Sequence, residues 1–240
     1  AYPILIKGLK RLEYRGYDSA GVALISDNRQ LNVYKTKGKV SELETFVTQK
    51  DISGNIGIAH TRWATHGEPC SANAHPHYSS SEKLALIHNG IIENYAAIKE
   101  ELIGKGYEFV SQTDTEVIAH LVHYYYKGDL LGAVENVLRR IRGAFALAIS
   151  CKDEPGRIVA ARVAAPLVIA LGENENFVAS DPMALAGVTD RYIYLEDGDV
   201  ADVRQQSAEI YNLQGDQFVR VERPVSVSYT HLRAHETRSN

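Results

Sequence analysis

The sequence predicts an α+β domain in which helices cover layered antiparallel sheets. Two observations carry this prediction, the order of the elements and the polar turns between them. Strand-like apolar runs dominate the first part of the chain, helical patterns occupy the middle, and strand-like runs return from residue 144 onward. Elements grouped in this way, rather than in regular strand–helix alternation, argue against a parallel βαβ sheet. Polar turns such as residues 26–29 favour hairpins and therefore antiparallel pairing.

The first part of the chain is predicted to begin with a helix and to continue mainly as strands. Leu5, Leu9 and Leu12 recur at helical spacing and mark one face of that helix. A later strand is expected to end at Asn89-Gly90, because this dipeptide is a strong turn signal. The remaining ranges are a helix at 40–48 and strands at 21–25, 31–34, 55–60 and 84–88.

The middle of the chain contains the predicted helices at residues 95–105, 114–126 and 130–141. The second of these has Thr113 as its expected N-cap and Glu116 near the N3 position, which together make a capping box. The third is expected to stop near Gly143.

Short strand-like runs fill the rest of the chain. No internal repeat or low-complexity linker interrupts them, so a single domain spanning residues 1–224 is expected. Residues 227–240 have no clear period and resemble a translated sequencing adapter, and we therefore exclude them from this domain. The predicted strands are 144–150, 158–161, 167–170, 177–179, 191–194, 200–204 and 209–212.

The composition is that of a globular domain. The 240 residues are 45% hydrophobic and 23% charged, which argues against a disordered chain. The formal net charge is -4, and basic and acidic residues are mixed along the sequence, so no basic stripe follows a nucleic-acid backbone. Nucleic acid is therefore not expected as a partner.

Cysteine usage points to a cytoplasmic location. The two cysteines, Cys70 and Cys151, are too few for a disulfide framework, and neither has a second cysteine at metal-ligand spacing. The apolar cluster at residues 4–6 is interrupted by Lys7 and Lys10, so neither a signal peptide nor a membrane span is expected.

Arg62 and Asp114 are candidates to hold a free amino acid. Arg62 follows a predicted strand, and its planar guanidinium suits two-point capture of a carboxylate. A surface ion pair or a structural arginine is the alternative role. Asp114 begins a predicted helix, where it either interacts with the helix dipole or pairs with a ligand ammonium. Together the two side chains would hold an amino acid, provided that the fold brings them into one cleft.

Asn89 and Gly90 are candidates for an oxyanion hole. A side-chain amide and a neighbouring backbone N–H at a sharp corner can each stabilise a tetrahedral intermediate by about 3 kcal/mol. An ordinary hairpin turn is the other interpretation. The neighbouring His88 and residues 91–94 favour the oxyanion hole over the ordinary turn.

The histidines raise the question of a metal site. His75 and His77 are close in sequence, but Pro76 stiffens the segment, and no third and fourth ligand stands at recognisable spacing. We therefore expect no metal. A glycine-rich phosphate loop is also lacking, so no cofactor is expected. We interpret the histidines as loop groups and as groups that support the site; they are His60, His66, His75, His77 and His88.

Five motifs form a specific combination: residues 12–21 (LEYRGYDSAG), 60–69 (HTRWATHGEP), 73–77 (NAHPH), 88–94 (HNGIIEN) and 113–120 (TDTEVIAH). This combination resembles the glutaminase domain of the glutamine:fructose-6-phosphate aminotransferases, also called glucosamine-6-phosphate synthases. The resemblance runs from residue 4 to about residue 224. It implies a class II amidotransferase with the four-layer αββα sandwich of N-terminal-nucleophile hydrolases.

The resemblance also implies roles for residues that bind the substrate. Arg62 would bind the α-carboxylate of L-glutamine, with Thr65 and His66 assisting. Asp114 would bind the α-ammonium, and Trp63 would belong to a loop that gates the site.

Further roles concern the chemistry. The resemblance implies that Asn89 and Gly90 form the oxyanion hole, and that Arg15 and Gly16 lie near the nucleophile. In this family the nucleophile is an N-terminal cysteine, whose own α-amine accepts the proton. We therefore expect that cysteine, with a first strand, to precede Ala1.

A sugar-phosphate isomerase domain is expected to follow the glutaminase domain. The full-length protein would then hydrolyse glutamine, pass ammonia to fructose-6-phosphate, form glucosamine-6-phosphate and be a homo-oligomer. The 240-residue chain alone is expected to be inactive. Alternatives are a glutaminase domain of the amidophosphoribosyltransferase or asparagine synthetase type, and a fragment that binds glutamine without turnover.

Overall fold

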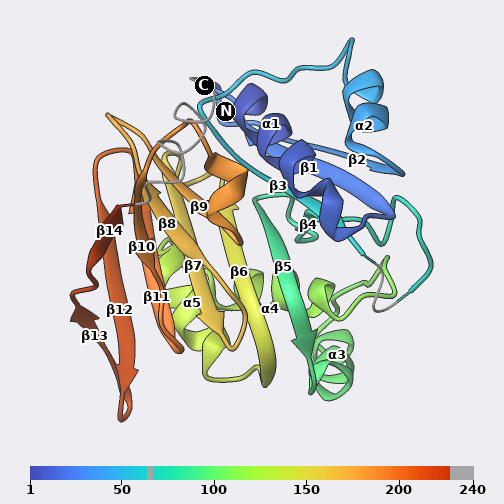
Figure 1. The fold of residues 1–240 in the computed structure, drawn as a ribbon. Helices are drawn as coiled ribbons and strands as arrows, with labels where there is room; N and C mark the ends of the chain where they lie inside the picture. Colours follow the sequence, from blue (N-terminus) through green and yellow to red (C-terminus); the bar gives the residue numbers. More distant parts are fainter. Residues whose placement is uncertain (64–66, 228–240) are drawn as a thin grey trace, which may run out of the picture.

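The computed structural model describes residues 1–63 and 67–227. Its elements form four layers, in which two layers of antiparallel sheet lie between helices (Figure 1). Within the described residues the strands form three sheets. We call them sheet A (β2-β1-β3), sheet B (β13-β12-β11-β7-β6-β5-β4) and sheet C (β14-β10-β8-β9). The predicted αββα sandwich is thereby confirmed.

Sheet A is a hairpin with a third antiparallel strand, and two helices cover its outer face. β1 pairs with β2 on one side and with β3 on the other. The helices bury Leu9 and Leu43 against Val22 and Leu24 of β1. These elements are α1 (Tyr2–Leu12), η1 (Glu13–Arg15), β1 (Ser19–Ile25), β2 (Leu31–Lys37), α2 (Val40–Phe46) and β3 (Ile56–Arg62).

Sheet B is the longest sheet and forms the second layer. Its strands β5 and β6 pair antiparallel along their whole lengths, from Leu84 opposite Cys151 to Ile92 opposite Gly143. The strands are β4 (His77–Tyr78), β5 (Leu84–Ile92), β6 (Gly143–Cys151), β7 (Arg157–Val163), β11 (Asp199–Arg204), β12 (Ala208–Gln214) and β13 (Gln217–Val221).

Three helices cover the face of sheet B that points away from sheets A and C; Figure 1 shows α4 and α5 behind its strands. The helix α4 is buried along most of its length, and Ile118 and Leu121 pack in the main core with Leu147 of β6. The helices are α3 (Tyr95–Gly104), α4 (Thr115–Tyr125) and α5 (Leu130–Leu138). No helix in residues 1–63 or 67–227 is long and apolar enough to cross a membrane.

Sheet C continues the layer of sheet A. Its inner face packs on sheet B through Ile169 and Ile193, and its outer face packs with Leu185 and with Leu12 of α1. The strand β14 follows the predicted domain end at residue 224 and pairs with β10. These elements are β8 (Val168–Leu171), β9 (Asn176–Ala179), η2 (Pro182–Leu185), β10 (Arg191–Tyr194) and β14 (Val225–Val227).

A groove of about 700 Å³ runs between sheets A and C, and we call it the long groove. Its sides are β3 and β9, the terminal strands of their sheets, and α1 also lines it. Residues of β5 and β6 complete the lining. Leu5, Ile58 and Val178 are among the apolar side chains that face the groove.

The predicted strand end at Asn89-Gly90 is wrong. The strand β5 continues to Ile92, and Gly90 lies opposite Phe145 in β6. Gly90 has a φ of +119°, and a Cβ on it would stand 2.0 Å from the carbonyl oxygen of Ala144. The glycine therefore allows a close approach of two strands, and tertiary pairing overrides the local turn signal.

The predicted capping box of α4 is also wrong. Asp114 occupies the N-cap position, and the Glu116 carboxylate accepts hydrogen bonds from the backbone N–H groups of Val110 and Ser111. Burial alone would raise the pKa of Glu116, but the His120 ring, whose Nε2 lies 3.5 Å away, and the hydrogen bonds from Ser111 and Val110 lower it to about 2. Glu116 therefore fixes the segment that leads into the helix.

Candidate active site

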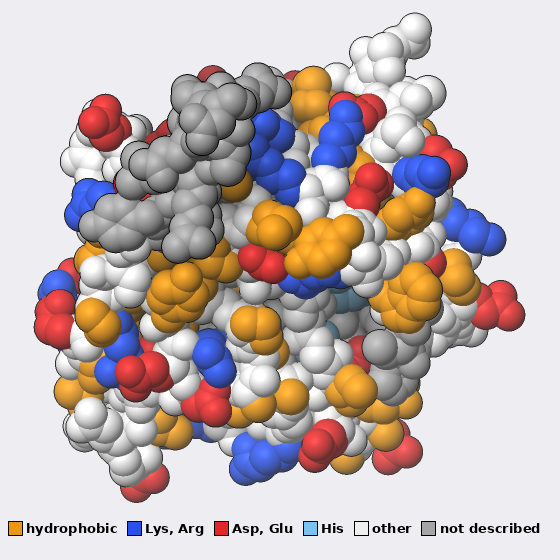
Figure 2. All heavy atoms as spheres, viewed as in Figure 1, with side chains coloured by type: hydrophobic (Ala, Val, Ile, Leu, Met, Phe, Trp, Pro, Cys, Tyr) orange, Lys and Arg blue, Asp and Glu red, His pale blue; other side chains and the backbone are white. Residues whose placement is uncertain are grey.

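A cavity of about 160 Å³ adjoins the long groove, and we call it the site cavity. Arg15, His60 and Asn89 line both spaces, so the groove leads into the site cavity. Arg62 and Asp114 also line the site cavity. The fold therefore brings Arg62 and Asp114, the two residues predicted to hold an amino acid, into one cleft. Figure 2 shows histidine side chains at the bottom of a hollow in this face of the molecule.

Arg62 is the last residue of β3, opposite Ser19 in β1. It is only 4% exposed, which rules out the surface ion pair. Its Nη2 donates to the carbonyl oxygen of Gly67 at 3.3 Å, and its Nη1 lies 3.8 Å from the carboxylate of Asp18. These two contacts orient the guanidinium in the wall of the cavity.

Asp114 lies at the start of α4 and is 3% exposed. Its Oδ2 accepts a hydrogen bond of 2.7 Å from the backbone N–H of Ile92. The carboxylate thus ties the start of the helix to the end of β5. A buried carboxylate facing a small cavity is suited to a cationic ligand group, because the interaction is weakly screened there.

Asn89 and Gly90 lie side by side in β5 and both line the site cavity. The Oδ1 of Asn89 lies 2.7 Å from the Nε2 of His60. The side-chain amide and the Gly90 backbone are therefore presented from a paired strand, which is a more rigid support than the predicted turn.

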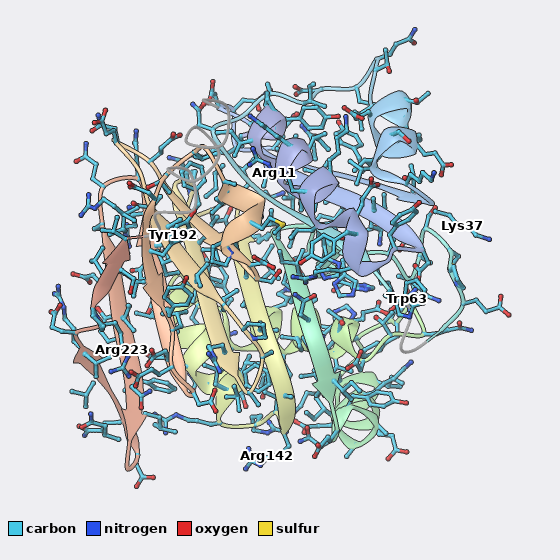
Figure 3. The ribbon with its side chains drawn as sticks, viewed as in Figure 1. Arg11, Lys37, Trp63, Arg142, Tyr192 and Arg223 are labelled. Atoms are coloured by element: carbon cyan, nitrogen blue, oxygen red, sulfur yellow. The ribbon has the colours of Figure 1, made fainter. Side chains whose placement is uncertain are left out.

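Trp63 directly follows β3 and is 68% exposed (Figure 3). Its indole ring lies over Gly16. A Cβ on Gly16 would stand 2.6 Å from the indole ring, and Gly16 has a φ of +97°. Glycine is therefore required here both by the backbone and by the ring above it. The Trp63 ring forms part of the wall of the site cavity.

Arg15 reaches from η1 towards the end of β9. Its Nη2 donates to the Ser180 Oγ at 3.3 Å, and its Nη1 lies 3.8 Å from the carboxylate of Asp181. Arg15 therefore stands where the long groove meets the site cavity. Two further predicted residues, Thr65 and His66, lie outside the described part of the chain.

Four histidines form a cluster beside the cavity, and their close contacts were not predicted from the sequence: His60, His75, His77 and His88. The rings of His60 and His75 stack at 4.4 Å between centroids. Burial lowers the pKa of His60 to about 4, that of His77 to about 3, and that of His75 well below its usual value. In residues 1–63 and 67–227, no group of three His, Cys, Asp or Glu residues is arranged to hold a metal ion.

Threonine hydroxyls connect this cluster to the start of α4. The Thr115 Oγ1 lies 2.8 Å from the Nδ1 of His88 and 3.4 Å from the Nε2 of His75. The Thr113 Oγ1 lies 3.0 Å from the Nε2 of His77. The histidines are thus hydrogen-bonded parts of the scaffold that carries Asn89 and Asp114.

Neither Cys70 nor Cys151 lines the site cavity or the long groove, and both are free thiols. Cys151 is buried at the end of β6, and this burial raises the pKa of its thiol. Neither cysteine is therefore placed to act as a thiolate at Asn89.

A family model described as a glutamine amidotransferase domain matches residues 60–187, which is more than half of the chain. The chain belongs to the glutamine amidotransferase family. The matched range of this amidotransferase includes Arg62, Asn89, Gly90 and Asp114.

Curated relatives of this amidotransferase domain are glutamine–fructose-6-phosphate aminotransferases. The one from Bacteroides thetaiotaomicron is 68% identical over 208 residues, covering 85% of this chain and 34% of the relative. The one from Bordetella pertussis is 56% identical over 229 residues, covering 94% of this chain and 37% of the relative. The chain thus spans about a third of the length of the curated relatives it matches.

Two solved structures share the fold. Glutamine phosphoribosylpyrophosphate amidotransferase from B. subtilis has a TM-score of 0.75 at 28% identity, covering 87% of this chain and 46% of that one. A glutamine aminotransferase class-II domain protein from Silicibacter pomeroyi has a TM-score of 0.55 at 18% identity, covering 81% of this chain and 91% of that one. The second likeness concerns the fold alone.

Proposed function

We propose that the site cavity binds L-glutamine and that, in the full-length protein, this domain catalyses hydrolysis of the glutamine side-chain amide to glutamate and ammonia. One observation carries the proposal. Arg62, Asn89, Gly90 and Asp114 line a single cavity in a chain of the glutamine amidotransferase family. A guanidinium, a carboxylate and two amide donors are the groups that a bound glutamine requires for recognition and reaction.

The two buried charges hold the amino-acid end of the substrate. Arg62 pairs with the α-carboxylate, and Asp114 pairs with the α-ammonium. Thr65 and His66, which follow Arg62 in the sequence, assist at the carboxylate. Trp63 covers the bound glutamine from the wall of the cavity. Charge-assisted hydrogen bonds of this kind contribute about 1.5–3 kcal/mol each.

The amide end of the substrate lies at β5. The Asn89 side-chain amide and the Gly90 N–H donate to the oxyanion that forms when the amide carbon is attacked. Removing one such donor from an enzyme slows turnover by about 10²–10³. The rigid pairing of β5 with β6 favours this role, because preorganised donors require no rearrangement during the reaction.

The nucleophile is an N-terminal cysteine carried by a strand in the long groove. Two observations support this placement: β3 and β9 border the groove as terminal strands, and the groove leads to Arg15 and Asn89. The cysteine α-amine accepts the thiol proton, and the thiolate attacks the amide carbon. Collapse of the tetrahedral intermediate releases ammonia, and water then hydrolyses the thioester to glutamate.

In the full-length protein, the ammonia passes to fructose-6-phosphate and forms glucosamine-6-phosphate on a sugar-phosphate isomerase domain. The relatives that are 68% and 56% identical carry the name of this aminotransferase, whereas the phosphoribosylpyrophosphate amidotransferase is 28% identical. The fructose-6-phosphate acceptor is therefore favoured. A cytoplasmic location and a homo-oligomeric full-length protein remain predictions.

Calorimetric titration of the 240-residue chain with L-glutamine tests the binding site. We expect saturable binding that weakens about tenfold or more in Arg62→Ala, because a charge-assisted contact is lost. Arg220→Ala is the matched control, since Arg220 is exposed and pairs with Glu209 at the surface. Equal glutamine affinities of the wild type and Arg62→Ala would contradict the proposed binding of the α-carboxylate by Arg62.

Two activity measurements test the reaction. The 240-residue chain is expected to release no glutamate, because neither of its cysteines lines the cavity. The full-length protein is expected to form glutamate and glucosamine-6-phosphate from glutamine and fructose-6-phosphate. Phosphoribosylpyrophosphate is the competing acceptor. Turnover with phosphoribosylpyrophosphate instead of fructose-6-phosphate would overturn the proposed acceptor.

A further inference from the structure

We propose that His60 is a positioning residue that sets the orientation of the Asn89 side-chain amide. This inference rests on the proposed oxyanion role of Asn89. His60 belongs to β3 of sheet A, whereas Asn89 belongs to β5 of sheet B. The His60 Nε2 lies 2.7 Å from the Asn89 Oδ1, which is the distance of a short hydrogen bond between the two sheet layers.

This hydrogen bond determines which end of the amide faces the cavity. A carboxamide oxygen only accepts, so the Nε2 of His60 must carry the hydrogen. With its oxygen held by His60, Asn89 directs its two Nδ2 hydrogens away from the imidazole. Asn89 lines the site cavity, where those hydrogens can meet a developing oxyanion. The terminal amide torsion of asparagine is broad, so a free amide would also present its oxygen.

The His60 ring is itself held in place by its neighbours. It stacks on the His75 ring, with 4.4 Å between the centroids and 19° between the planes. The Nδ1 of His75 accepts a 3.3 Å hydrogen bond from the His88 backbone N–H, and its Nε2 lies 3.4 Å from the Thr115 Oγ1. Rotation of His60 would therefore disturb a ring that is tied to both β5 and α4.

The charge state of His60 supports a positioning role rather than proton transfer. Burial lowers the pKa of the imidazole to about 4. The hydrogen bond with Asn89 acts in the opposite direction, and the nearby guanidinium groups of Arg15 and Arg62 lower the pKa further. At neutral pH the ring therefore carries one hydrogen, and the contact with Asn89 assigns it to Nε2. A general base for this reaction would need a pKa closer to the working pH.

The first test is nuclear magnetic resonance of the 240-residue chain, which does not depend on activity. We expect ¹⁵N spectra to show the Nε2–H tautomer of His60 with a slowly exchanging hydrogen. Asn89→Ala should speed that exchange at least tenfold, because the acceptor is removed. His123, which lines neither cavity, is the internal control and should not respond. An Nδ1–H tautomer of His60 in the wild type would overturn the proposal.

The second test measures glutamine hydrolysis by the full-length protein. His60→Phe should lower kcat about tenfold to a hundredfold. This loss is no larger than the loss expected when an oxyanion donor is removed altogether. The KM for glutamine should change less than about threefold. His60→Gln should recover part of kcat, because its side-chain N–H can still donate to Asn89. His123→Phe is the control and should keep the wild-type kcat.

The outcomes separate this inference from the proposed function. A wild-type protein without glutaminase activity would refute the function, while the spectra would still test the hydrogen bond. An active wild type whose kcat is unchanged in His60→Phe would overturn the positioning role. If His60→Phe does not fold, His60→Ala replaces it and is expected to have a lower kcat than His60→Gln, because alanine cannot donate to Asn89. Equal kcat values for His60→Ala and His60→Gln would then overturn the positioning role.

Discussion

The Asp114 carboxylate accepts a hydrogen bond of 2.7 Å from the backbone N–H of Ile92. This bond joins the start of α4 to the last residue of β5, and both residues are buried. The same carboxylate is the proposed partner of the glutamine ammonium. One side chain therefore has a structural role and a binding role, and two substitutions can separate them.

Asp114→Asn should keep the structural role and lose the binding role. An asparagine oxygen can still accept from Ile92, so we expect the free energy of unfolding to fall by less than about 1 kcal/mol. Asp114→Ala leaves a buried N–H without its acceptor and should cost about 1–3 kcal/mol. Both variants should weaken glutamine binding about tenfold or more. Urea denaturation and calorimetry measure the two effects, and undiminished glutamine affinity in Asp114→Asn would contradict the ion pair.

Gly16→Ala should displace the indole of Trp63. The new Cβ would stand 2.6 Å from the ring, and the φ of +97° is unfavourable for alanine, so we expect a stability loss of about 1 kcal/mol or more. Trp63 is the single tryptophan of the sequence, so its fluorescence reports the displacement directly. We expect a change in the emission maximum of the folded protein.

Gly106→Ala is the matched control for this fluorescence experiment. Gly106 also has a positive φ, of +88°, but nothing lies within 4 Å of a Cβ built there. It should lose stability through backbone strain without changing the tryptophan emission. Identical spectra for wild type and Gly16→Ala would show that the ring does not lie on Gly16.

The helices were the part of the fold that the sequence predicted best. Apolar residues at helical spacing identified α4, observed at Thr115–Tyr125 and predicted at 114–126. Three strands were not predicted: β13, and the strands β4 and β14, which are too short to show a period. For β13 a signal existed: Gly215 and Asp216 form a two-residue turn between apolar runs.

The residues of the candidate site could be proposed from the sequence, but their arrangement in space could not. Arg62, Asn89 and Asp114 were identified from their residue types and motifs, and the fold brings them to one cavity. The contact between His60 and Asn89 could not be predicted, because it joins strands of different sheets. Sequence spacing carries no information on such a contact between layers.

Mild acid should destabilise the protein through histidines that the folded state holds neutral. The pKa values of His60 and His77 in the folded state are about 4 and about 3, below the usual 6.5. Between these values and about pH 6.5, the unfolded chain binds protons that the folded chain does not. The free energy of unfolding therefore falls as the pH falls, by up to about 1.4 kcal/mol per pH unit for each histidine. His75 acts in the same direction.

Urea denaturation from about pH 7.5 down to about pH 4.5 measures this dependence. His77→Asn removes one titrating group and retains a side chain that can hydrogen-bond to Thr113. The slope of the free energy of unfolding against pH should therefore decrease by about 1.4 kcal/mol per pH unit, which corresponds to one proton. A free energy of unfolding that stays constant over this range would show that the histidines are not buried in the neutral form.

Arg157 is expected to contribute strongly to the stability of sheet B through its buried charge. Its Nε and Nη2 donate to the two carboxylate oxygens of Asp202 at 2.9 Å each, and this pair joins β7 to β11. Both side chains are 8% exposed. Arg157→Ala should cost about 3 kcal/mol or more, because it leaves a buried carboxylate without its main partner.

Two comparisons distinguish this buried pair from an ordinary ion pair. Arg220→Ala removes an exposed arginine that pairs with Glu209 at 2.9 Å, and it should cost less than about 1 kcal/mol. The double variant Arg157→Met/Asp202→Leu removes both buried charges and should be more stable than Arg157→Ala, because the cost of the single variant lies in the desolvated charge left behind. A double variant that is no more stable than Arg157→Ala would mean that packing at Arg157, and not its charge, holds β7 and β11 together.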